Sequence, residues 1–86
     1  MKYCFIHHQD PGHGWVEVPK ALLRTLNITG ISRYSYMDDF NAYLEEDCDA
    51  GLFLATLKDR GFDVELVEDV INNDSPIRNM MRYAND

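Results

Sequence analysis

The sequence has few of the features that define large classes of proteins. Its two cysteines, Cys4 and Cys48, lie far apart and form no C-x-x-C pair, so they predict reduced thiols rather than a disulfide framework. No apolar run approaches the roughly 20 residues that a membrane-spanning helix needs, and the apolar stretch at the start is too short for a signal peptide. We therefore expect a cytoplasmic protein without a membrane span.

Basic residues are also scarce. Eight Lys and Arg stand against fifteen Asp and Glu, which gives a formal net charge of −7, and most of the acids lie between residues 38 and 74. Binding to nucleic-acid phosphates rests on clustered Lys and Arg, so this distribution argues against direct nucleic-acid binding. It favours a partner with a basic surface, a bound cation, or solubility alone.

No internal repeat, low-complexity tract or linker interrupts the 86 residues, so residues 1–86 are expected to form a single domain. Hydrophobic residues make up 45% of the chain, which excludes a disordered chain and is enough for a modest core. A domain of this size leaves little room for a pocket that encloses a substrate. No catalytic motif is complete, and a role without catalysis is favoured over an enzyme.

Alternating apolar residues and turn residues predict the elements of the fold. Strands are expected at residues 3–8, 15–18, 31–37, 42–45 and 64–70. One short helix is expected to begin at Pro19, and a longer one, capped by Asp47 or Asp49, is expected to end at Gly61. The order β-β-α-β-β-α-β predicts an α+β fold with a small mixed or antiparallel sheet and both helices packed on one face.

The sequence of residues 75–86 allows two kinds of secondary structure. Ser75-Pro76 can cap a last helical turn, or the segment can run extended. Residues 75–86 are accordingly expected to form a loosely ordered tail on the domain.

All three histidines lie in one short segment, His7-His8-Gln9-Asp10-Pro11-Gly12-His13. Neighbouring residues of a strand face opposite sides, so His7 and His8 should diverge, and only His8, Asp10 and His13 can converge. Their spacing is not a fixed metal motif, and the favoured interpretation is a shaped turn beside Trp15 that binds no cofactor. The alternative is a zinc or manganese site formed by these three residues, with Glu45 or Asp47 as a further ligand.

A protein-binding surface is the leading hypothesis. Aromatic side chains are enriched at interface hot spots, and the acidic residues near the second helix suit a basic partner. The predicted contact residues are His13, Trp15, Tyr34, Tyr36, Glu45, Glu46, Asp47 and Asp49. A metal-binding protein or metal-dependent enzyme and an acidic mimic of DNA are the alternatives.

Four motifs lie within residues 10–50: Asp10-Pro11-Gly12-His13-Gly14-Trp15, Glu17-Val18-Pro19, Ile31-Ser32-Arg33-Tyr34-Ser35-Tyr36 and Tyr43-Leu44-Glu45-Glu46-Asp47-Cys48-Asp49-Ala50. Together they resemble a family of small uncharacterised proteins encoded by bacteriophages and mobile elements of bacteria. That resemblance implies an accessory role in the bacterial cytoplasm, such as inhibiting or redirecting a host or defence protein.

A second, local likeness covers residues 16–28, with a strand, Pro19-Lys20, a short helix and a following strand. This stretch is similar to the swapped-hairpin fold of AbrB-like regulators and antitoxins. The likeness implies a homodimer, whereas the basic residues on which those domains depend for DNA binding are reduced here to Lys20, Arg24 and Arg33.

Overall fold

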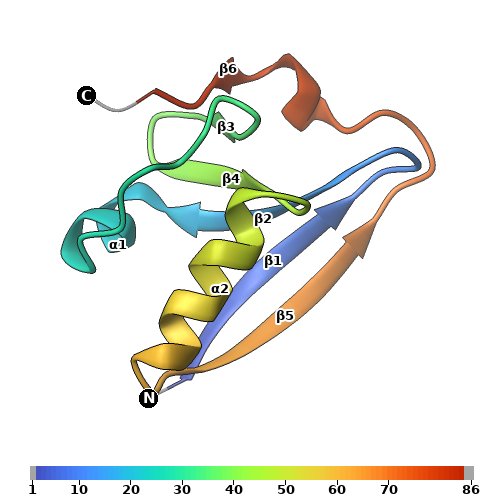
Figure 1. Ribbon diagram of the computed structural model, residues 1–86. Coiled ribbons are helices and arrows are strands. Elements are labelled where there is room, and N and C mark those ends of the chain that lie inside the picture. The colour runs from blue at the N-terminus through green and yellow to red at the C-terminus, as the bar shows by residue number, and fades with distance from the viewer. Residues whose placement is uncertain (1, 85–86) are drawn as a thin grey trace.

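Six strands form one mixed sheet in the computed structural model, which describes residues 2–84 (Figure 1). In chain order the elements are β1 (Lys2–Gln9), β2 (Gly14–Pro19), α1 (Lys20–Thr25), β3 (Tyr36–Met37), β4 (Asn41–Glu45), α2 (Asp49–Asp59), β5 (Asp63–Val70), the 3₁₀ turn η1 (Pro76–Asn79) and β6 (Met81–Arg82). The strands lie in the order β5-β1-β2-β4-β3-β6, with β1 and β5 parallel and the other pairs antiparallel. The predicted α+β class and mixed sheet are confirmed, but a sixth strand follows the predicted order.

The expected third strand is much shorter than predicted. Only Tyr36–Met37 of residues 31–37 pairs with other strands. The preceding residues turn away because the backbone N–H and hydroxyl of Ser32 and the hydroxyl of Ser35 donate hydrogen bonds to the carboxylate of Asp49. Local alternation predicted a strand here, but these hydrogen bonds to a distant acid replace its ladder.

The main core lies between the sheet and α2, which crosses one face of the sheet (Figure 1). Strands β1, β2 and β4 contribute alternate apolar side chains to this face, among them Phe5, Val16 and Leu44, against Phe53 and Leu57 of α2. The short helix α1 buries Leu23 in the same cluster. Both helices therefore contribute to the core on one face.

The predicted end of α2 is confirmed. Gly61 has a φ of +85°, a conformation that residues with a side chain rarely adopt. Its N–H donates to Lys58 O at 3.0 Å, and the N–H of Phe62 donates to Leu57 O at 3.0 Å. Phe62 then folds back against Tyr3 of β1, with 5.2 Å between ring centroids, so α2 leads directly into β5.

The opposite face of the sheet is covered by the end of the chain. There Trp15, Tyr36 and Tyr43 pack against Ile77 of η1. The segment that follows forms β6, which pairs with β3 at the edge of the sheet. Both predicted alternatives for this segment occur one after the other: first a helical turn and then an extended strand. Residues 85–86 of the predicted tail lie outside the described residues.

Within residues 2–84, no helix is long and apolar enough to cross a membrane. The longest, α2, has 11 residues.

Candidate functional site

An open pocket of about 580 Å³ lies where the ends of β2 and β4 meet the C-terminal segment. We call it the Trp15 pocket. Its lining residues are His13, Trp15, Tyr34, Tyr36, Glu45, Asp47, Cys48, Arg78 and Arg82. Six of them belong to the contact set predicted from the sequence, and its volume falls in the range of pockets that hold ligands.

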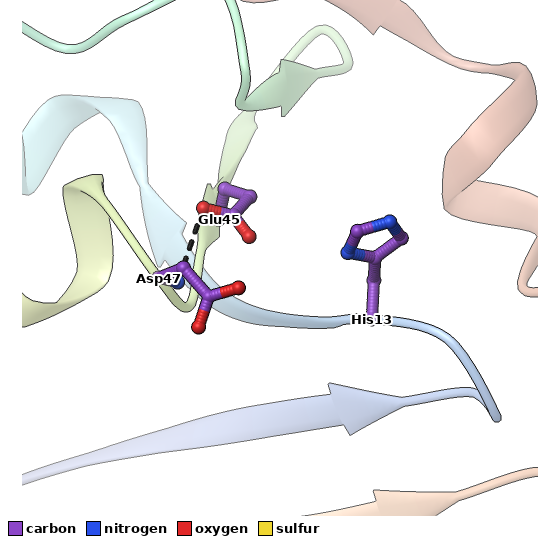
Figure 2. A group of neighbouring side chains, drawn as sticks. All are labelled: His13, Glu45 and Asp47. Atoms are coloured by element: carbon purple, nitrogen blue, oxygen red, sulfur yellow. Dashed lines mark hydrogen bonds between the residues drawn. The ribbon is translucent and has the colours of Figure 1, made fainter.

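The pairing of β2 with β4 sets one wall of the pocket. Trp15 lies opposite Glu45, and the N–H of Glu46 donates to Gly14 O at 3.0 Å. The two segments therefore stay in register beyond the paired strand residues. The same register brings His13 across from Asp47. Figure 2 shows the side chains of His13, Glu45 and Asp47 around a shared space, and one ligand atom of each lies within 4.8 Å of the others.

The base of the pocket is aromatic. Trp15 is only 2% exposed and contacts the rings of Tyr36 and His13, with centroids 6.1 and 6.0 Å away. The guanidinium of Arg78 lies 5.5 Å from the Trp15 ring, and that of Arg82 lies 4.5 Å from the Tyr36 ring. The indole N–H of Trp15 is buried and has no hydrogen-bond acceptor among the described residues.

Asp49 supports the pocket from behind. The sequence predicted it as a contact residue and a helix cap, but it is 2% exposed, and no side chain caps α2. Its carboxylate instead accepts hydrogen bonds from Ser32 N (3.1 Å), Ser32 Oγ (2.7 Å) and Ser35 Oγ. Ser35 Oγ in turn accepts from Glu45 N at 3.0 Å. Asp49 thereby ties the loop that carries Tyr34, which is 68% exposed, to the start of α2 and the end of β4.

Asp10 is engaged within the fold rather than free to bind a metal. Its side chain is fully buried and accepts two hydrogen bonds from Arg78, at 2.6 Å from Nε and 2.8 Å from Nη2. The backbone N–H groups of Gly12, His13 and Ser75 donate to the same carboxylate at 2.9–3.0 Å. The Arg78 hydrogen bonds hold the pKa of Asp10 far below its ordinary value of 3.8, although burial opposes this shift.

The other two histidines point to opposite faces of β1, as predicted. His8 Nε2 lies 2.8 Å from Glu17 Oε1, and its Nδ1 lies 3.3 Å from Asp69 Oδ2. His7 contacts Glu68 at 3.1 Å and Glu46 at 3.3 Å. His8, Asp10 and His13 therefore do not gather as the sequence predicted. Among the described residues, the group with metal-ligand spacing is His13, Glu45 and Asp47.

The side chain of Glu46 lies outside the pocket, beside His7. Gly14 leaves room for it there, because it has no side chain. A Cβ placed on Gly14 would lie 2.8 Å from Glu46 Cδ and 2.9 Å from His7 Nε2, so a larger residue would push this pair apart. Of the eight predicted contact residues, Glu46 thus faces His7 and Asp49 is buried, whereas the remaining six line the pocket.

Sequence reasoning missed three lining residues, Cys48, Arg78 and Arg82. Cys48 is an exposed free thiol beside Asp47. The two arginines reach the site from η1 and β6, and their partners lie far away in sequence: Asp10 is 68 residues from Arg78, and Arg33 is 49 residues from Arg82. No local pattern in the chain signals such contacts.

Comparisons with protein-family models, with curated proteins and with solved structures find no match to this chain. The likenesses to phage-encoded proteins and to AbrB-like domains therefore stay predictions. What the fold defines is a small α+β domain with an open, aromatic-based pocket bordered by carboxylates and arginines.

Proposed function

We propose that this protein acts by binding another protein, and that the Trp15 pocket receives a basic side chain of that partner. The observation that carries the proposal is the convergence of six predicted contact residues, from three separate segments of the chain, on one pocket. A buried tryptophan with tyrosines and arginines around it has the composition of an interface hot spot.

The charges that line the pocket favour a basic side chain of the partner as the group that enters it. Neither Glu45 nor Asp47 has an ion-pair partner in the part of the chain that the structure describes. Arg78, by contrast, already pairs with Asp10. A Lys or Arg that enters beside Tyr34 would pair with free carboxylates and lie against an aromatic ring, which is favourable for a cation.

The pocket is the anchor of the proposed interface rather than all of it. A stable protein interface buries about 800 Å² on each partner, which is more than one inserted side chain supplies. The exposed loop around Tyr34 and the exposed acids next to the pocket, Glu46 among them, extend the surface.

The biological setting follows from the resemblance to phage and mobile-element proteins. On that basis we propose an accessory protein of the bacterial cytoplasm whose partner is a host or defence factor. The alternative of a DNA mimic has less support, because Asp38, Asp49, Glu65 and Glu68 bind donors within the chain instead of standing free along one face.

The test is quantitative capture from a bacterial lysate with purified protein on beads, read by mass spectrometry. The double variant Tyr34→Ala/Asp47→Lys should lose at least nine-tenths of the partner that the wild-type protein captures. The matched control is Phe40→Ala/Asp39→Lys, which makes the same chemical changes at an exposed turn outside the pocket and should retain the partner. Equal capture by both double variants would refute the assignment of the interface to the pocket.

A further inference from the structure

We propose that His13, Glu45 and Asp47 form a binding site for a divalent transition-metal ion, with zinc as the ion of choice. This trio keeps His13 from the site that the sequence offered and combines it with both Glu45 and Asp47, each considered there as a further ligand, in place of His8 and Asp10. The proposal does not depend on a protein partner, because it concerns the purified chain alone.

Rotations of the side chains would bring the three ligand atoms to the separations found in a metal site. Ligand atoms bound at 2.0–2.2 Å to a tetrahedral ion are about 3.4 Å apart, and the present atoms lie within 4.8 Å of one another. His13 and Asp47 are exposed and Glu45 is the least exposed of the three. The two exposed side chains can therefore close on the ion while Glu45 stays in place.

The backbone beneath the three ligands is already fixed. The N–H of His13 donates to Asp10 Oδ1 at 2.9 Å, and the N–H of Asp10 donates to His13 O at 2.9 Å. At the end of β4, Glu45 Oε2 accepts a hydrogen bond from Asp47 N at 3.0 Å. This bond orients the Glu45 carboxylate and leaves its second oxygen for the ion (Figure 2). Such outer contacts orient metal ligands in known sites.

A second observation concerns Trp15, which lines the same pocket. The indole N–H of Trp15 is buried without an acceptor among the described residues, although Trp15 lines the pocket beside Glu45. Buried donors are rarely left unpaired. An ion held by three protein ligands keeps at least one position for water or a carboxylate, and such a ligand brings oxygen acceptors into the pocket.

The donor set also selects the kind of ion. One imidazole with two carboxylates suits zinc, manganese or ferrous iron, whereas Ca²⁺ and Mg²⁺ prefer oxygen ligands alone. Two arginines line the pocket. The charge of Arg78 is matched by Asp10, whereas Arg82 lies over the Tyr36 ring and donates to Arg33 O, so the two carboxylates outnumber the one arginine without a carboxylate partner among residues 2–84. The expected order of affinity is therefore zinc above manganese, and both above calcium and magnesium.

The experiment is calorimetric titration of the untagged protein with Zn²⁺ alone. Wild type should bind one equivalent, and His13→Ala and Asp47→Asn should each weaken binding at least tenfold. Glu46→Gln is the matched control for an adjacent exposed acid, and His8→Gln tests the trio that the sequence predicted. Both controls should bind like wild type.

An NMR titration gives a readout that a folding defect cannot imitate. The imidazole resonances of His13 should shift on addition of Zn²⁺, and those of His7 and His8 should stay in place. Absence of stoichiometric binding would overturn the proposal, as would unchanged affinity in both His13→Ala and Asp47→Asn. Loss of binding in His8→Gln with retention in Asp47→Asn would place the ion elsewhere and overturn it equally.

Discussion

Replacing Asp49 by alanine should destabilise the protein far more than its place in an acidic run suggests. The substitution removes the acceptor of three hydrogen bonds, from Ser32 N, Ser32 Oγ and Ser35 Oγ. Ser35 is fully buried, whereas Ser32 is partly exposed and can turn to water. Since a hydrogen bond to a charged group contributes about 1.5–3 kcal/mol, we expect a total loss of about 3 kcal/mol.

That loss is large for a domain of this size. At about 0.05–0.15 kcal/mol per residue, the whole free energy of unfolding is about 4–13 kcal/mol. A 3 kcal/mol change should lower Tm by about 12–24 °C, and it should be measurable in urea unfolding followed by Trp15 fluorescence and circular dichroism. Asp47→Ala, an exposed acid two residues earlier, should stay within about 0.5 kcal/mol of wild type. Similar stability of the two variants would refute a structural role for Asp49.

Three further predictions concern the elements around the site. Asp10→Asn should destabilise the protein at pH 7, and the difference in stability from wild type should shrink as the pH falls below about 4. The pKa of Asp10 is lower in the folded than in the unfolded protein, so its ionised carboxylate stabilises the fold above the unfolded pKa of 3.8. This stabilisation is lost as the pH falls toward the folded pKa. Ile77→Ala should cost about 3 kcal/mol in urea unfolding because Ile77 is 3% exposed, whereas a tail without packing would lose almost nothing. Gly14→Ala should destabilise the protein by separating the Glu46 carboxylate from the His7 ring, which both lie within 3 Å of a Cβ at this position. Gly51→Ala, in α2 with nothing within 4 Å of a new Cβ, should stabilise by about 1 kcal/mol. Equal melting temperatures for these two variants would contradict the close packing around Gly14.

The sequence predicted the elements that depend on local chemistry. Gly61 and the spacing of Ala50, Phe53 and Leu57 were enough to predict α2 and its end, because helix periodicity and a left-handed stop are short-range properties. The turn at Asp10 also follows from the residues themselves, since its carboxylate accepts from Gly12 N and His13 N.

Long-range partners decided what the sequence could not predict. Residues 31–35 alternate like a strand, yet the carboxylate of Asp49 holds Ser32 and Ser35 out of the sheet. The candidate metal trio depended on the β2–β4 register, in which Trp15 pairs with Glu45. A shift of one residue would turn alternate side chains to the other face, and no property of either strand alone reveals which register forms.

The acids of this chain divide by whether a donor reaches them inside the fold. Asp10 and Asp49 are buried and fully engaged, so they hold the C-terminal segment and the Tyr34 loop in place. Glu45 and Asp47 have no ion-pair partners among residues 2–84, and both line the Trp15 pocket. A basic side chain and a zinc ion both require this pair of carboxylates, so the two proposed ligands compete. Saturating Zn²⁺ should then reduce partner capture by the wild-type protein, and Mg²⁺ at the same concentration should leave it unchanged.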